Sequence, residues 1–201
     1  MQIVLATSNK GKVREIANIF RDKSVVLKTK ADFGLGDIPE TGSTFEENAL
    51  LKAKAVSEAT GLIALADDSG LVVPYLNGEP GVYSARYAGP KATDEQNNAK
   101  LLARLQGVDR EQRYAYFVCV LALCSPKGKH FLVKGKWEGY IAERPRGENG
   151  FGYDPIFVDK NTGFTAAELS LEQKNKISHR AKALLALQEK LPYFLSEFVK
   201  T

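Results

Sequence analysis

The alternation of apolar and polar positions divides the chain into short strand-like and helix-like segments. Strands are predicted where apolar runs are bounded by turn residues, at Ile3–Ala6, Ser24–Lys28, Leu62–Ala66, Leu71–Val73, Tyr114–Cys124 and Lys129–Trp137. The last two runs flank Ser125-Pro126-Lys127-Gly128, whose composition predicts a hairpin turn.

Helices are predicted where apolar residues recur every three or four positions. They cover Lys10–Phe20, Thr44 to about Ala59, Asp94–Leu105 and Ser170 to Leu191, just before Pro192. Two of them open with a capping box, at Thr44-Phe45-Glu46-Glu47 and at Ser170-Leu171-Glu172-Gln173. Because helices follow several strands and one hairpin is present, the pattern predicts an α/β fold with a mixed sheet flanked by helices.

Size and charge narrow the classes of protein that fit. The chain has 201 residues, of which 44% are hydrophobic, enough for one core shared by a single domain over residues 1–201. No apolar run approaches the roughly 20 residues that span a bilayer, and the first residues enter a strand without a leader, so we expect a cytoplasmic protein that does not bind a membrane. The net charge of +4 is scattered along the chain, which disfavours a nucleic-acid partner.

The two cysteines predict no disulfide and no zinc site. Cys119 and Cys124 lie five residues apart in one predicted strand, so they face opposite sides of it and cannot bond to each other. Buried free thiols of a reducing compartment are the expected state. The only histidines, His130 and His179, do not form a Cys/His cluster with zinc spacing.

A polar segment between the first strand and the first helix suits an anion. It comprises Thr7, Ser8, Asn9, Lys10, Gly11 and Lys12. Backbone N–H groups at a helix N-terminus are unpaired and attract a phosphate, and the two lysines add positive charge. The spacing does not match the Walker pattern. A polar turn with surface lysines explains the same residues.

The helix opened by Thr44 carries a lysine in an unusual place. Lys52 shares a face with Phe45, Ala49 and Val56, and a lysine on an apolar face needs an anionic partner or a route to water. Glu47 is explained as the acid of the capping box. Glu40, just ahead of the helix, could reach a metal, although a loop glutamate is usually solvated.

Two adjacent acids give the sharpest signal. Asp67 and Asp68 follow the apolar run Leu62–Ala66, and we expect them to end a buried strand at the sheet edge where α/β proteins bind ligands. Neighbouring carboxylates repel unless a cation is present, and Mg²⁺ prefers a few carboxylates with waters and phosphates. An Asp/Gly turn is the alternative, but a metal or catalytic role is favoured.

Two later segments are ambiguous by themselves. Asn149–Pro155 surrounds Phe151 with glycines, so its backbone suits either close approach to a stacked base or a tight turn with a buried ring. Lys174, His179 and Arg180 lie on the last predicted helix, where a solvated lysine and a structural histidine explain two of them without any ligand.

Taken together, these segments resemble the inosine/xanthosine triphosphate pyrophosphatase family. The matching stretches span nearly the whole chain in the family's order: 6–12, 40–45, 48–49, 52–53, 66–70, 80–87, 150–155 and 178–180. Ser8 stands where bacterial members often have glycine. The resemblance implies an elongated, two-lobed α/β fold with the active site in the cleft between the lobes, a homodimer, and Mg²⁺-dependent hydrolysis of ITP, dITP and XTP.

The resemblance also implies roles for individual residues. It makes Glu40 and Asp68 magnesium ligands, with Asp68 also the proton acceptor, and adds Lys52 and Asp67 to the catalytic group. It places substrate contacts on Thr7, Ser8, Asn9, Lys10, Gly11, Lys12, Ser69, Phe151, Gly152, Tyr153, Asp154, Lys174, His179 and Arg180.

A mechanism follows as a hypothesis from these residue types. Asp68, with Asp67 as a possible helper, activates a water that attacks the α-phosphorus, and lysines neutralise the pyrophosphate that leaves. Donors near Phe151–Asp154 and on Arg180 would face the purine O6, which does not explain how GTP is rejected. The rival readings are a pyrophosphatase for pyrimidine or modified nucleotides, a nucleotide sensor without catalysis, and a nucleic-acid-binding module.

Overall fold

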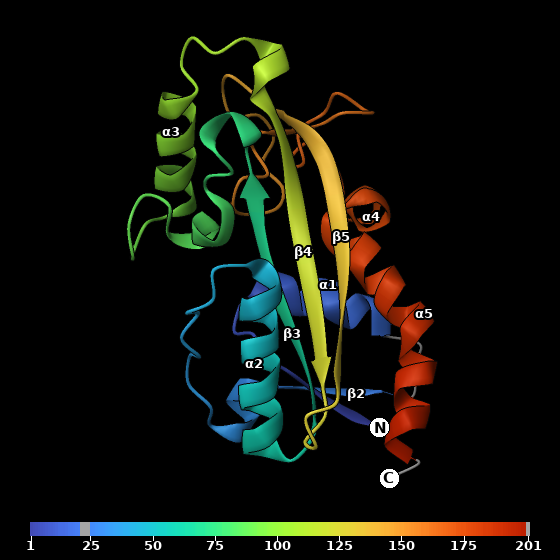
Figure 1. The fold of residues 1–201 in the computed structure, drawn as a ribbon. Coiled ribbons are helices and arrows are strands. Elements are labelled where there is room, and N and C mark those ends of the chain that lie inside the picture. The colour runs from blue at the N-terminus through green and yellow to red at the C-terminus, as the bar shows by residue number, and fades with distance from the viewer. Residues whose placement is uncertain (21–24, 200–201) are drawn as a thin grey trace. The chain divides into compact units, whose positions relative to one another are not determined.

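The strands of the chain form one mixed β-sheet (Figure 1). The computed structural model describes residues 1–20 and 25–199, and within them six strands follow the order β2-β1-β3-β4-β5-β6. Their bounds are β1 Gln2–Leu5, β2 Val26–Thr29, β3 Ile63–Val72, β4 Tyr114–Cys124, β5 His130–Ile141 and β6 Phe157–Asp159. Strand β1 pairs in parallel with β2 and β3, whereas β5 and β6 are antiparallel. The predicted α/β fold with a mixed sheet is therefore confirmed.

The first three helices begin and end within a residue of where local sequence signals place them. Their bounds are α1 Lys10–Phe20, α2 Phe45–Thr60, α3 Asp94–Arg104, α4 Leu171–Ile177 and α5 His179–Val199, with short 3-10 turns at Lys30–Phe33, Pro74–Leu76, Gly81–Arg86 and Arg110–Arg113. Both predicted capping boxes form, and Gly61 ends α2 in the left-handed conformation (φ 66°). Within the described part of the chain, no helix is both long and apolar enough to cross a membrane.

The chain divides into two compact units, each built from separate stretches of sequence. The first unit comprises Met1–Asp68, Cys119–Gly135 and Arg180–Thr201, and the second comprises Ser69–Val118 and Lys136–His179. Each unit buries its own cluster of apolar side chains. The single domain expected from the chain length and the site between two lobes expected from the resemblance both stay predictions.

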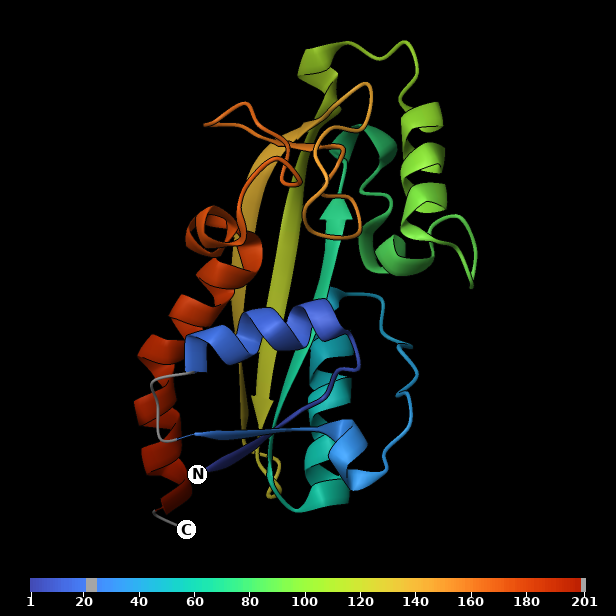
Figure 2. The ribbon, with the colours of Figure 1, turned by 180° about the vertical axis from the view of Figure 1, so that it is seen from behind.

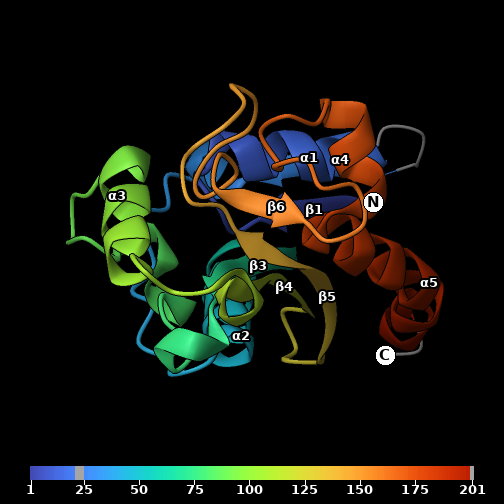
Figure 3. The same ribbon diagram turned by 90° about the horizontal axis from the view of Figure 1, so that it is seen from above.

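In the first unit, helices cover both faces of the strands. Figures 2 and 3 show α1 and α2 on opposite sides of β1. Ile16 of α1 and Leu184 and Leu187 of α5 are buried with Leu5 in one cluster, while α2 buries residues such as Val56 on the other side. Helical spacing of these apolar residues explains why each helix presents one face to the strands.

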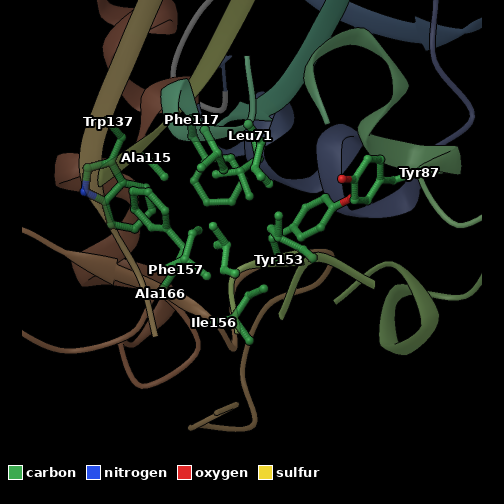
Figure 4. Close-up of a cluster of buried hydrophobic side chains, with 14 of the residues drawn as sticks. Leu71, Tyr87, Ala115, Phe117, Trp137, Tyr153, Ile156, Phe157 and Ala166 are labelled. Carbon is green, nitrogen blue, oxygen red and sulfur yellow. The ribbon is translucent and has the colours of Figure 1, made fainter. Parts of the chain in front are cut away.

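The second unit is built around aromatic residues. Phe117, Trp137 and Phe157 contact one another, with ring centroids 4.5 to 6.2 Å apart in tilted and edge arrangements (Figure 4). The indole nitrogen of Trp137 donates a hydrogen bond to Asp159 (2.7 Å), which satisfies its one polar atom. This core supports the loop that carries Tyr153, whose side chain is part of the same cluster.

Several sequence predictions about element boundaries are wrong. Asp67, Asp68, Ser69 and Gly70 do not end a strand or form a turn, because β3 runs without interruption from Ile63 to Val72. The two acids lie within a buried strand, and the cations that pair with them make this possible. The argument from the carboxyl edge of a sheet therefore does not apply here.

The last predicted helix is two helices. Ser178 has an extended backbone (φ −67°, ψ 159°) that ends α4, and α5 starts at His179 and continues through Pro192. Serine side chains compete with the helical hydrogen bonds, which favours such a break. The Ser125–Gly128 turn forms as predicted, and the Gly128 N–H donates to the Ser125 carbonyl. The prediction was wrong at other ends, since β5 continues to Ile141 and α5 to Val199, and β6 was not predicted. Ser24, predicted to begin the second strand, lies outside the described residues.

Candidate active site

A buried lysine joins two acidic side chains in the first unit. Lys52 points from the apolar face of α2, and its ammonium donates to Glu40 Oε1 (2.6 Å), to Asp68 Oδ1 (2.8 Å) and to the backbone carbonyl of Asp67 (2.9 Å). Only 9% of the Lys52 side chain and 8% of that of Asp68 are exposed. The expectation that this lysine needs an anionic partner is confirmed.

The pKa values of this pair reflect burial and neighbouring charge. Burial raises the pKa of Asp68 to about 6, with the Glu40 charge adding to the rise and the Lys52 charge opposing it. Burial lowers the pKa of Lys52, but the charges of Asp68 and Glu40 outweigh this effect and raise it overall. Lys52 therefore stays charged at neutral pH. Asp68 can take up or release a proton at a pH close to neutral.

Asp67 is surrounded by donors on the other side of the strand. Its side chain is fully buried and contacts the Lys12 ammonium, the Arg180 guanidinium (Nε to Oδ2, 2.9 Å) and the Cys119 thiol, which donates to Oδ2 (3.0 Å). Burial raises the pKa of this carboxyl, but the charges of Arg180 and Lys12 dominate and hold it well below its usual range. Asp67 is thus a permanently ionised anchor.

Two members of this network were missed in the sequence. Glu15 of α1 is buried and pairs with Arg180, and Cys119 donates to Asp67. In the sequence, Glu15 lies one turn after Lys12 and next to the apolar Ile16 of α1. An acid in that position was a usable signal for a buried charge that needs a partner. Cys119 was correctly expected to be a buried free thiol, and Cys124 is one too. The pKa of Cys119 is raised well above its usual value by burial and by the Asp67 charge.

The polar segment before α1 is held by its own asparagine. Asn9 Oδ1 accepts from the backbone N–H groups of Gly11 (2.9 Å) and Lys12 (3.1 Å), and Thr7 Oγ1 accepts from the Asn9 N–H (3.2 Å). Asn9 therefore caps α1, and two of the N–H groups expected to face a phosphate have partners in this structure. The side chains of Ser8 and Lys10 are exposed and remain available to an anion.

In the second unit, the glycine-rich loop folds around an aspartate. Asp154 Oδ2 accepts from the Phe151 N–H (3.0 Å) and from the Lys174 ammonium (2.5 Å), which lies 4.9 Å from the centre of the Phe151 ring. Gly150 has a φ of 83°, and a side chain there would meet Asp154 Oδ2 at 2.0 Å, so only glycine fits. The Tyr153 hydroxyl donates to the Ser84 carbonyl (2.8 Å) and is buried.

Some of the predicted catalytic, metal-binding and substrate residues form one connected group in each unit. The first group contains Lys12, Glu40, Lys52, Asp67, Asp68 and Arg180, and the second contains Phe151, Gly152, Tyr153, Asp154 and Lys174. His179 stacks on Phe117, with centroids 4.7 Å apart and planes at 14°, as expected for a structural histidine. Ser69 also belongs to the second unit.

The donors predicted to read the purine O6 have partners within the chain. The Phe151 N–H donates to Asp154, the Gly152 N–H donates to Asp94, and the Arg180 guanidinium contacts Asp67 and Glu15. In this structure these donors hold parts of the chain together, and the sequence-based account of base selection stays a prediction. Folding uses these donors because buried polar groups need partners.

Sequence and structure comparisons relate the chain to known proteins. The model of the Ham1 family matches residues 3–190. A dITP/XTP pyrophosphatase of Nitratidesulfovibrio vulgaris is 55% identical over 199 residues, which cover 96% of each chain, and one of Geobacter sulfurreducens is 53% identical over 191 residues, covering 94% of this chain and 96% of the relative. The solved structure of a HAM1 protein from Coxiella burnetii superimposes with a TM-score of 0.90 at 47% identity, covering 96% of this chain and 99% of that one.

Proposed function

The chain belongs to the Ham1 family, and from this membership we infer that it hydrolyses ITP, dITP and XTP to the monophosphate and pyrophosphate with the help of Mg²⁺. With relatives named dITP/XTP pyrophosphatases at more than half identity over nearly the full length, the protein is a nucleoside triphosphate pyrophosphatase, a hydrolase. Its exact substrates, its products and its metal are the content of the proposal.

The observation that carries the proposal is the buried ammonium of Lys52 between Glu40 and Asp68. A structural ion pair needs one partner, whereas here two carboxylates share one cation and Asp68 has a pKa of about 6. Perturbed acids of this kind are typical of catalytic sites, because burial and like charge raise the pKa toward working pH.

The donor set suits a magnesium ion. Among the described residues, no three His, Cys, Asp or Glu side chains are grouped to hold a metal by themselves. Mg²⁺ in nucleotide enzymes uses one or two carboxylates and takes its other ligands from water and substrate phosphates, so Glu40 and Asp68 fit. When bound, the ion would supply positive charge that neutralises the phosphate oxygens.

The chain's own residues then have distinct tasks in the reaction. Asp68 accepts a proton from a water molecule while the oxygen of that water attacks the α-phosphorus. The bond from the α-phosphorus to the bridging oxygen then breaks, and pyrophosphate leaves. Lys10, Lys12 and Lys52 offset the negative charge that grows on the leaving group. In this proposal Asp67 assists Asp68 mainly by orienting Lys12, because the charges of Arg180 and Lys12 hold its pKa low and make it a weak base.

The residues of the second unit serve the nucleoside in this proposal. Phe151 offers a half-buried ring for stacking. Asp154 accepts from its backbone N–H, and the Lys174 ammonium lies 4.9 Å from the centre of its ring. Thr7–Lys12, Ser69, His179 and Arg180 complete the substrate contacts inferred from the resemblance. A homodimer, a cytoplasmic location and the absence of a nucleic-acid partner also belong to the proposal, and light scattering tests the dimer.

The deciding experiment is a substrate panel with the purified protein. Pyrophosphate release is measured with and without Mg²⁺ from ITP, dITP, XTP, GTP, ATP, dTTP and UTP, and the nucleotide product is identified by chromatography. We expect monophosphate and pyrophosphate from the first three only. Faster release from dTTP or UTP would favour a pyrimidine enzyme, and nucleotide binding without any turnover would favour a sensor.

A further inference from the structure

One helix holds both backbone polar groups of a single glycine in the second unit. The Gly152 N–H donates to Asp94 Oδ2 (2.7 Å), and the Gly152 carbonyl accepts from Asn98 Nδ2 (3.0 Å). Asp94 and Asn98 lie four residues apart on α3, so both side chains project from the same face of that helix. The two contacts bridge 58 and 54 residues of sequence, so only the tertiary structure creates them.

Helix α3 is itself firmly anchored. A capping box formed by Thr93 and Gln96 closes its N-terminus, and the buried Leu101 joins the aromatic core. The Asn97 side chain accepts from the Ala88 N–H (2.8 Å) and donates to the Ala85 carbonyl (3.3 Å). The helix can therefore act as a rigid support for the loop that Asp94 and Asn98 hold.

Gly152 is the residue at which the loop most needs such support. Its φ of 63° lies in the left-handed region, and glycine has the largest range of alternative backbone conformations. On either side the loop is already tied, through the Phe151 N–H to Asp154 and through the Tyr153 hydroxyl to Ser84. A rotation at Gly152 would change the direction of the Phe151 ring.

We propose that Asp94 and Asn98 are positioning residues that fix the peptide groups of Gly152 and so hold Phe151 ready for the base of a purine nucleotide. The proposal rests on the function proposed above, in which Phe151–Asp154 contact the substrate. Pre-organisation of this kind raises affinity because the loop loses little freedom on binding. Neither residue touches the reacting phosphates, so the effect is confined to the nucleoside.

The test compares variants in binding and in turnover. Asp94→Ala and Asn98→Ala should each weaken the binding of dIMP, measured by calorimetry, by about three- to tenfold, the range for one lost hydrogen bond. KM for dITP should rise by a similar factor with kcat within about twofold, as for lost uniform binding. Asp94→Asn keeps an oxygen acceptor and should recover most of the loss. Hydrogen exchange at the Gly152 amide should speed up in Asp94→Ala.

Two neighbouring residues give matched controls. Glu95 follows Asp94 in the exposed first turn of α3. Glu95→Ala therefore removes one negative charge from the same turn as Asp94→Ala does. Asn97→Ala removes a buried asparagine that holds Ala85 and Ala88 instead of Gly152. Both should bind dIMP as the wild type does, even if Asn97→Ala lowers the melting temperature. Inorganic tripolyphosphate, which lacks a nucleoside, should inhibit all variants equally.

Several outcomes would overturn the positioning role. Unchanged dIMP binding in both Asp94→Ala and Asn98→Ala would do so, as would an equal loss in Asn97→Ala or weaker inhibition by tripolyphosphate. If the wild type binds dIMP but releases no pyrophosphate from dITP, the proposed function fails while the dIMP comparison still decides the role of α3. A wild type that does not bind dIMP contradicts both.

Discussion

Replacing Lys52 by methionine tests the arrangement at the centre of the candidate site. The substitution keeps the length and the apolar stem of the side chain but removes the ammonium that Glu40 and Asp68 share. The side chains of Lys52 and Asp68 are more than nine-tenths buried, and that of Glu40 is 28% exposed. The variant therefore leaves one buried and one half-buried carboxylate without their common cation.

The magnitude follows from the burial of this pair. Removing one partner of a buried ion pair costs about 3–5 kcal/mol, because the remaining charge is left without compensation. Since Glu40 is partly in water and Asp68 can protonate, we expect the lower end, about 3 kcal/mol at pH 7.5 without Mg²⁺. For a chain of this size that corresponds to a fall in melting temperature of roughly 6–12 °C.

The loss of stability should depend on pH in a defined direction. The pKa of Asp68, already about 6, rises further when the opposing Lys52 charge is gone. Below that pKa the carboxyl is neutral and no longer needs a cation, so the difference between variant and wild type should shrink from pH 7.5 to pH 5. Added Mg²⁺ should also reduce it, if Glu40 and Asp68 bind the ion.

Urea unfolding followed by circular dichroism at pH 7.5 and pH 5 measures both effects. Lys54→Met is the matched control, because Lys54 lies on the same helix and forms no ion pair within the part of the chain that the structure describes. A destabilisation of Lys52→Met below about 1 kcal/mol at pH 7.5 would refute the reasoning, as would a loss of equal size at both pH values. A small loss would mean that the two carboxylates do not depend on this cation, and an equal loss at both pH values would mean that the loss does not depend on the ionisation of Asp68.

Three further predictions concern the same two units. Asp68→Asn should lower pyrophosphate release from dITP by about 100-fold or more while circular dichroism and melting stay near those of the wild type, and near-normal turnover would contradict its role as proton acceptor. In the metal-free protein, carboxyl NMR should show Asp68 titrating near pH 6. Mg²⁺ should move that titration to lower pH, and an unchanged titration curve would argue against Asp68 as a metal ligand. Gly150→Ala should destabilise by about 2–3 kcal/mol and Gly163→Ala by about 1 kcal/mol in urea unfolding, because both positions have positive φ but only the first places a new carbon against Asp154.

Local signals in the sequence determined much of the secondary structure. The capping boxes at Thr44 and Ser170 and the glycine after α2 depend on residues three or four positions apart, and all three are where the pattern predicts them. The strand Tyr114–Cys124 has the predicted bounds. Lys52 was also readable, because a lysine on an apolar helical face demands a partner wherever the chain later places one.

Only the tertiary structure decided how β3 continues and which distant residues meet. In the sequence, Asp67 and Asp68 look like the end of a strand. In the structure, Lys12, Arg180 and Lys52 from other elements pair with these acids, so the strand can continue while buried. The pairing of Arg180 with Glu15 spans 165 residues, and the hold of α3 on Gly152 spans more than 50. Such contacts arise from the packing of whole elements, so spacing along the chain does not predict which distant residues meet. Periodicity and caps instead reflect hydrogen bonds within one or two turns.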